Sequence, residues 1–298
     1  MHSVSISIGM VIAGFLGALG IGALGHRLGW LTLDGAIAAV VVGGCIFGFA
    51  GWQGAVVLLL FFVSSSLLSR LNREEAHGAD SQPKKSQPRN ARQVLANGAV
   101  AALAAVWLAI VEAQTRALGW EASGALAAPG WLAGVLGAAG ALGVWPKVAL
   151  AGALAAATAD TWATEIGRWA KGIPRSALTA RIVEPGESGG MTAYGTFAGL
   201  VGAAMIGTAA AWVWEDLGIS HAMAIEVAGF AGMWFDSLLG AGVQYKAYCA
   251  ACGRTIEDPK HKHPVQRPRG WRFVDNDVVN FAATLAGAVM ALLGLRSF

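Results

Sequence analysis

The charged residues of this chain are gathered into a few segments, and the stretches between them stay apolar over almost the length of a membrane span. Only 13% of the 298 residues are charged, whereas 55% are hydrophobic, a balance that water-soluble domains do not show. A bilayer-spanning helix needs about 20 apolar residues. Backbone amides inside lipid must be paired within the protein, so the apolar stretches must be helical. We therefore predict an all-α, polytopic membrane protein that forms a single transmembrane domain over residues 1–298.

Hydropathy and loop charge together predict about eight transmembrane helices. The stretch 131–159 is ambiguous because Pro146 can kink or break a helix, giving either one long helix or two short segments. Basic residues concentrate in 70–92, 160–190 and 246–272, which the positive-inside rule places in the cytoplasm. Stretch 131–159 then crosses once, and both termini lie outside a bacterial-type cytoplasmic membrane. The expected spans are 4–24, 31–50, 52–69, 94–111, 131–159, 191–213, 223–243 and 276–295.

Other features limit the partners and processing of the chain. The net charge is only +3, with no basic stripe interleaved with aromatics, so a nucleic acid partner is excluded. The first 24 residues contain no Lys or Arg, which favours a retained first helix over a secretory signal. Residues 70–92 are polar and contain proline, and we expect a flexible cytoplasmic loop there. Small residues four apart, as in Gly14, Ala18 and Gly22, suit close helix packing in lipid.

Two carboxylates enter apolar stretches, where charges are costly and usually line a substrate or ion pathway. Asp160 follows the apolar run 131–159, and Asp236 lies within or near the span 223–243. If the segment around Asp160 is helical, Asp160, Thr164 and Gly167 share one face. The alternative for Asp160 is a helix end at the interface with a solvated side chain.

Further polar groups stand where the chain enters the membrane, at the starts of two apolar stretches. Carboxylates, amides and water suit Mg²⁺, which proteins commonly hold with one or two carboxylates plus substrate phosphates. The alternative for Asp275 and Asp277 is N-terminal capping of the last helix. The predicted Mg²⁺ ligands are Asp160, Asp236, Asn276, Asp277 and Asn280, with Glu165 and Asn97 as supporting polar contacts.

A cluster rich in Gly, Ser and Thr directly precedes the span 191–213. Helix N-termini present unpaired N–H groups, and glycines let a phosphate approach the backbone. Plain capped turns use the same residue types, which leaves that alternative open. The residues that could cradle phosphate are Ser188, Gly189, Gly190, Thr192, Gly195 and Thr196.

The cytoplasmic segment 246–272 holds four potential metal ligands, Cys249, Cys252, His261 and His263. Two thiols and two imidazoles match tetrahedral zinc in a closed, structural site, although the H-x-H spacing is shorter than in common zinc fingers. The alternative is a pair of cytoplasmic thiols beside two surface histidines.

Five short motifs occur in order along nearly the whole chain, and together they resemble one family. They are Gln93–Gly98, Ala159–Gly167, Ser188–Thr192 followed by Gly195 and Thr196, Asp236–Gly240, and Asn276–Asn280. The chain resembles the integral membrane proteins that include transmembrane protein 19 and plant phytyl-phosphate kinase. The resemblance implies transfer of a phosphoryl group from a nucleoside triphosphate, with CTP as the expected donor, to a prenyl monophosphate, giving the diphosphate. A homodimer is compatible with the sequence.

The family in turn resembles phytol and dolichol kinases and phosphatidate cytidylyltransferases, whose cytoplasmic sites use acidic residues and Mg²⁺. The comparable kinase segment begins Gly-Asp, where this chain has Ala159-Asp160. No clear match to the kinases' lysine exists, and the residues that could offset triphosphate charge are Lys171, Arg175 and Arg181. His263 stands where the family commonly has a cysteine. Two alternative functions remain open, a CDP-lipid-forming cytidylyltransferase and a secondary transporter with a broken helix at Pro146.

Overall fold

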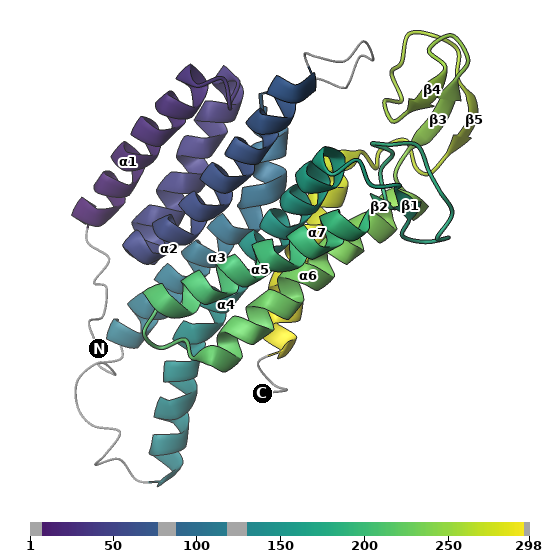
Figure 1. Cartoon of the computed structure of the whole chain (residues 1–298). Helices are drawn as coiled ribbons and strands as arrows, with labels where there is room; N and C mark the ends of the chain where they lie inside the picture. The colour runs from purple at the N-terminus through teal and green to yellow at the C-terminus, as the bar shows by residue number, and fades with distance from the viewer. Residues whose placement is uncertain (1–7, 77–87, 118–129, 295–298) are drawn as a thin grey trace.

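A computed structural model describes residues 8–76, 88–117 and 130–294, and for 72–76 and 130–142 it describes the backbone alone. These residues form seven helices and five short strands (Figure 1). The helices are α1 Ile8–Arg27, α2 Leu33–Ala76, α3 Ala91–Ala117, α4 Gly130–Trp169, α5 Ala193–Val213, α6 Ile219–Gly242 and α7 Asn276–Gly294. The strands are β1 Arg175–Ser176, β2 Gly190–Met191, β3 Lys246–Cys249, β4 Arg254–Ile256 and β5 Gln266–Arg269.

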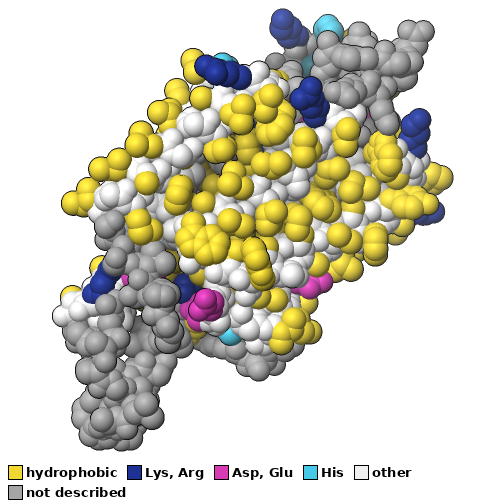
Figure 2. Space-filling model, turned by 60° about the vertical axis from the view of Figure 1, so that its left-hand side comes forward, with side chains coloured by type: hydrophobic (Ala, Val, Ile, Leu, Met, Phe, Trp, Pro, Cys, Tyr) yellow, Lys and Arg dark blue, Asp and Glu magenta, His cyan; other side chains and the backbone are white. Residues whose placement is uncertain are grey.

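The outer surface of the helical bundle is apolar. Six helices, all except α4, are long and apolar enough to span a membrane over the described residues. Large side chains such as Trp212, Val227 and Phe197 are more than half exposed, which a soluble protein would not tolerate over such an area. Hydrophobic side chains cover the middle of the face in Figure 2, and Lys and Arg lie toward its edges. The predicted class, a polytopic all-α membrane protein, is confirmed.

Helix α2 folds back on itself at Gly51. The backbone there has a φ of 67°, which is outside the helical range and is readily adopted by glycine. Trp30 lies just before α2, and Phe62 lies in the half of α2 that follows Gly51. Because of the reversal the two rings are in contact, with 5.8 Å between their centroids. The break falls between the predicted spans 31–50 and 52–69. The number of membrane crossings, about eight, stays a prediction.

Helix α4 lies at the centre of the bundle and contacts α2, α3, α5, α6 and α7. It is a single helix with Pro146 inside, so the alternative of two separate segments in 131–159 does not occur. Residues 148–159 are all buried, and most are alanine or another small residue. Ala155 and Ala156 pack against Gly229 and Gly232 of α6, which brings these helices into close contact.

Helix α1 packs on the first half of α2 through small side chains. Gly14, Ala18 and Gly22 are buried on one face of α1. A Cβ at Gly14 would lie 2.6 Å from the backbone nitrogen of Gly48, and one at Gly22 would lie 3.1 Å from the Ala36 carbonyl oxygen. The predicted small-residue packing is confirmed at this interface.

The strands lie together at one end of the bundle (Figure 1). β3 pairs antiparallel with β4 and β5 in the order β4-β3-β5, and β1 pairs antiparallel with β2. The segment 246–272, expected as a loop, therefore contains a small sheet. In the predicted loop 70–92, α2 continues to Ala76 and residues 77–87 lie outside the described part of the chain.

Candidate functional site

Two membrane carboxylates meet at the end of the bundle that carries the strands. Ala156 of α4 touches Gly232 of α6, and one helical turn further along these helices come Asp160 and Asp236. In the orientation that satisfies its hydrogen bonds, the Asn280 amide of α7 donates to Asp236 Oδ2 over 3.0 Å. Three helices therefore bring Asp160, Asp236 and Asn280 to one level, as the sequence predicted for an oxygen-rich site.

These carboxylates are close enough to influence each other electrostatically. The Asp160 carboxylate repels the Asp236 carboxylate. Asp160 is itself repelled by the Glu165 carboxylate and attracted by the Arg168 guanidinium. Both aspartates are half-buried, so their mutual repulsion is less screened than in water. Two neighbouring carboxylates fit Mg²⁺, which proteins commonly hold with one or two carboxylates plus substrate phosphates. Binding of Mg²⁺ there stays a prediction.

The other predicted Mg²⁺ ligands have partners of their own. Asn276 donates through its amide to the Asn280 side-chain oxygen over 3.2 Å. Asp277 lies 3.5 Å from the Arg92 guanidinium, and Asp275 accepts a 2.7 Å hydrogen bond from the same group. Asp275 also accepts the Val278 N–H over 3.1 Å, so it caps α7. The capping alternative holds for Asp275, whereas Asp277 forms an ion pair with α3.

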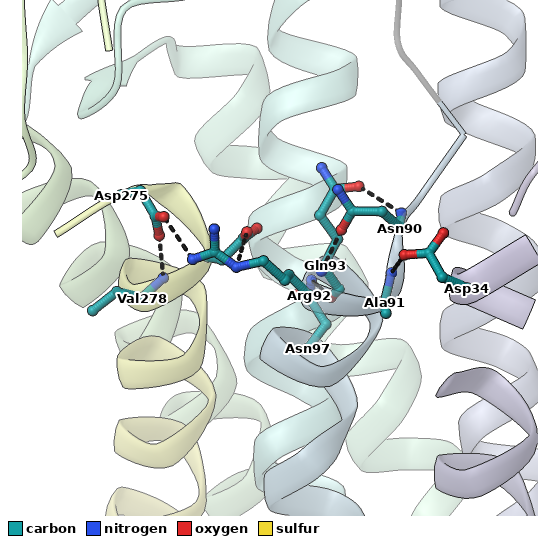
Figure 3. Close-up of polar contacts among 9 residues, drawn as sticks. Asp34, Asn90, Ala91, Arg92, Gln93, Asn97, Asp275 and Val278 are labelled. Atoms are coloured by element: carbon teal, nitrogen blue, oxygen red, sulfur yellow. Dashed lines mark hydrogen bonds and ion pairs between the residues drawn. The ribbon is translucent and has the colours of Figure 1, made fainter. Parts of the chain in front are cut away.

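The N-terminus of α3 joins the two sides of this end of the molecule (Figure 3). Asn90 and Gln93 form a reciprocal capping box, with N–H to side-chain oxygen distances of 3.0 and 3.1 Å. The Ala91 N–H donates to Asp34 at the start of α2 over 2.9 Å, while Arg92 reaches α7. Asn97 donates to the Gln93 carbonyl oxygen over 2.9 Å. The polar residues of this motif thus hold α3 between its neighbours.

Glu165 of α4 contacts α2. It is 7% exposed and accepts a 2.7 Å hydrogen bond from Ser69. It also interacts electrostatically with Arg89, whose guanidinium lies 5.7 Å from the centre of the Phe61 ring. Burial lowers the pKa of Arg89, and the Glu165 carboxylate opposes that shift. Ser69 and Arg89 were not among the predicted site residues, although Arg89 lies in the basic segment 70–92.

The backbone of Arg89 is held firmly by the segment before α2. Its N–H donates to the Trp30 carbonyl over 2.9 Å, and its carbonyl accepts the Thr32 N–H over 3.1 Å. These bonds place the guanidinium beside α2 and α4, although its sequence neighbours are loop residues.

The predicted phosphate cradle is an ordered turn packed against α6 and the sheet. Gly189, with a φ of +78°, lies against the backbone of Ala241, and Gly190 pairs in β2. Thr192 caps α5 by accepting the Gly195 N–H over 3.1 Å, and Thr196 donates to the Thr192 carbonyl over 2.9 Å. The capped turn is therefore present, and phosphate binding there stays a prediction.

Side chains from the sheet hold this turn in place. The Ser188 N–H donates to Glu257 over 2.8 Å, and its hydroxyl accepts the Gln244 amide over 3.0 Å. Buried Lys246 lies 3.2 Å from the Glu187 carboxylate and donates to the Ser188 carbonyl. The turn and the sheet therefore behave as one unit, which residue spacing did not indicate.

A polar cavity of about 690 Å³ opens between this turn and the sheet. Arg181, Lys246 and Arg269 line it together with Glu184 and Glu187. Of the three predicted basic residues, Arg181 alone lines this cavity. Arg175 donates to the Ala180 carbonyl over 3.1 Å, and Lys171 is an exposed residue just after α4.

The four predicted zinc ligands converge at the end of the sheet. Their ligand atoms all lie within 4.8 Å of one another. The distances are 3.3 Å from Cys249 Sγ to His261 Nε2, and 3.4 Å from Cys252 Sγ to both His261 Nε2 and His263 Nδ1. A tetrahedral ion with bonds of about 2.0–2.3 Å separates its ligand atoms by roughly 3.3–3.8 Å. The hydrogen bond between the thiols, with burial, raises the pKa of Cys252. The cluster fits a metal ion.

Comparison with known proteins agrees with these motifs. The model of the integral membrane family DUF92 matches residues 9–288. The chain belongs to the DUF92 family. It is 27% identical to Protein PGR of Arabidopsis thaliana over 266 residues, covering 86% of this chain and 85% of the relative. An uncharacterized membrane protein of Methanocaldococcus jannaschii is 27% identical over 265 residues, covering 88% and 85%. No solved structure gives a significant match. The predicted resemblance to the family of transmembrane protein 19 and plant phytyl-phosphate kinase is confirmed.

Proposed function

We propose that this DUF92 protein is a membrane-embedded kinase that phosphorylates a prenyl monophosphate such as phytyl phosphate, with CTP as donor. The observation that carries the proposal is the meeting of Asp160 and Asp236 from separate helices, with Asn280 bonded to Asp236, at one end of the bundle. Phosphoryl transfer depends mainly on positioning and charge neutralisation, so these residues suffice without a protein nucleophile.

The proposed reaction moves one phosphoryl group from CTP to the lipid monophosphate. An oxygen of the lipid monophosphate forms a bond to the γ-phosphorus of CTP, the bond from that phosphorus to the β-phosphate oxygen breaks, and CDP leaves. Mg²⁺ held by Asp160 and Asp236 would neutralise charge on the transferred group. Asn280 orients Asp236. The exposed basic residues Arg175 and Arg181, together with Lys171, stand at the same end of the molecule to offset triphosphate charge.

The test is incubation of the purified protein with phytyl or farnesyl monophosphate, Mg²⁺ and each nucleoside triphosphate, with products identified by mass spectrometry. A gain of one phosphate supports the kinase. A gain of a nucleoside monophosphate would instead identify a CDP-lipid-forming cytidylyltransferase. No product with any donor, combined with substrate flux in liposomes, would favour a transporter.

Substitution of the aspartates tests the site itself. Asp160→Asn and Asp236→Asn are each expected to lower turnover by about 100-fold or more, because electrostatic stabilisation of a transferring phosphoryl group is a large catalytic contribution. Glu226→Gln is the control, since Glu226 lies on α6 ten residues before Asp236, roughly 15 Å along the helix. Full activity in both Asp→Asn variants would refute the assigned site.

We also propose that Cys249, Cys252, His261 and His263 bind a structural zinc ion. Their ligand number and spacing support this proposal. The zinc would hold β3 against the segment after β4, close to the turn that the sheet supports.

A further inference from the structure

A second cavity, of about 260 Å³, lies among α1, the two halves of α2 and α3, and its walls are mainly apolar. On the second half of α2, Ala55, Leu58, Leu59 and Phe62 line it. Their spacing of three and four residues places them on one helical face. The other segments contribute single faces in the same way, as Gly17, Ala18, Ile21 and Gly22 do on α1. Four helical segments therefore line the cavity.

One end of this cavity is polar. Its polar lining residues, Arg89, Gln93 and Asn97, come from the N-terminus of α3 and the residue shortly before it. Arg89 lies beside Phe61, so this end is level with the late part of α2. Ala55 lies seven residues before Phe62, which places it roughly 10 Å deeper along the helix. The cavity thus has a cationic mouth and a deep apolar end.

The mouth lies on the side of Glu165, which follows Asp160 by five residues on α4. Arg89 interacts electrostatically with Glu165, Glu165 with Asp160, and Asp160 with Asp236. A group bound at the mouth would therefore stand at the edge of the proposed catalytic site. An anion fits better than a cation or a neutral group, because a guanidinium offers several parallel N–H donors to phosphate oxygens.

We propose that this cavity holds the hydrocarbon chain of a single-chain lipid phosphate, with its phosphate at Arg89. The proposal rests on the kinase proposed above and names where that enzyme's lipid substrate lies. The cationic mouth matches the phosphate, the apolar interior matches the chain, and the volume of about 260 Å³ favours one chain over two. The lipid phosphate then lies on the side of Glu165 and Asp160, where one of its oxygens would accept the γ-phosphoryl group of CTP.

The test is photo-crosslinking of the purified protein with decyl phosphate that carries a diazirine at the end of its chain. Crosslinked peptides are identified by mass spectrometry, which requires no catalytic turnover. The expected result is labelling around Gly17, Phe47 and Ala55, which line the deep part of the cavity. Labelling confined to lipid-facing residues such as Leu19 or Trp52 would overturn the proposal.

Filling the deep end tests the role of the chain. Ala55→Phe is expected to reduce labelling by decyl phosphate about tenfold or more, because the new ring occupies the space of the chain. A hexyl analogue should lose much less, because its chain ends before it reaches Ala55. Val41→Phe is the matched control on the same helix, since Val41 is 51% exposed and does not line the cavity. Equal loss in both variants, or equal loss for both chain lengths, would overturn the proposal.

Removing the charge of Arg89 tests whether the phosphate headgroup binds at the mouth of the cavity. Arg89→Gln should weaken labelling by decyl phosphate while leaving labelling by the corresponding uncharged decanol probe unchanged. Arg89→Lys should retain part of the preference for phosphate. Loss of labelling by both probes to the same extent would show that Arg89 does not recognise the headgroup.

These experiments separate the two proposals. Deep labelling by the phosphate probe with no phosphoryl transfer from any donor would retain the lipid site and reject the kinase. Phosphoryl transfer with labelling only outside the cavity would retain the kinase and reject this lipid site.

Discussion

Gly189 shows how one residue sets the position of the turn before α5. Its φ of +78° is left-handed, and a Cβ there would meet the backbone of Ala241 and lie 2.6 Å from the Ser237 carbonyl oxygen. Backbone atoms cannot give way as the end of a side chain can. Glycine is therefore required at this position for both its conformational freedom and its lack of a side chain.

Gly186 is the matched control for a substitution at Gly189. It has a φ of +83° but open space around its Cβ position. Gly186→Ala should cost about 1 kcal/mol, from the left-handed backbone alone. Gly189→Ala should cost clearly more, because steric overlap is added, and it should also reduce the proposed kinase activity. Thermal unfolding of the purified variants measures the loss of stability, and the mass-spectrometric assay of lipid products measures the loss of activity. Similar unfolding temperatures for the two variants would contradict the contact with α6.

At the scale of elements, the sheet and the 184–191 turn are joined by buried polar contacts. The Lys246 and Glu187 side chains are only 6% and 13% exposed, and their charged groups are 3.2 Å apart. Removing one partner of a buried ion pair leaves an uncompensated charge, which is strongly destabilising. The pair therefore links β3 to the segment that leads into α5.

Lys246→Met is expected to destabilise the folded protein by about 3–5 kcal/mol, since it leaves Glu187 buried and unpaired. Lys260→Met, at an exposed position, should change stability by less than about 0.5 kcal/mol. The measurement is thermal unfolding in detergent. Adding Glu187→Gln to Lys246→Met should recover part of the loss, and a lack of recovery would argue against the ion pair as its source.

The cluster of two cysteines and two histidines lies at the end of the same sheet. Elemental analysis of the purified protein is expected to find one zinc ion per chain, because four convergent ligands complete a tetrahedral shell. Cys252→Ser should release most of the zinc and lower the unfolding temperature. His263→Cys should retain it, since thiolate and imidazole both ligate zinc. Zinc-free wild-type protein, purified without chelators, would reject the site.

At the scale of the whole molecule, charge differs between the two ends of the bundle. The strand-bearing end carries Arg89, Arg168 and the basic residues that follow α4, whereas the opposite end holds a 2.6 Å ion pair between Lys147 and Asp216. The positive-inside rule predicts that the strand-bearing end, with the carboxylate site, faces the cytoplasm. The site would then face the nucleotide pool.

Cysteine labelling on intact cells checks this orientation. Glu215→Cys, exposed at the end opposite to the strands, should react with a membrane-impermeant maleimide. Thr179→Cys, exposed near the strands, should react only after the cells are permeabilised. The wild-type chain gives the background from its native thiols. The reverse pattern would place the carboxylate site outside.

The sequence by itself determined the class of this protein, the helical nature of its apolar stretches and the candidate residues Asp160 and Asp236. These conclusions follow from local physical costs, because lipid requires paired backbone amides and penalises buried charge wherever they occur. The spacing of cysteines and histidines likewise indicated the ligand cluster, since all its members lie within fifteen residues of one another.

The tertiary structure alone decided which distant groups meet. Hydropathy and helical spacing say which residues share a face of one helix, but not which face of another helix they contact. Arg89 beside Glu165, Arg92 on Asp277 and the reversal of α2 at Gly51 all depend on packing between segments distant in the chain. Both cavities arise in the same way, because their walls come from several elements whose close approach small residues permit.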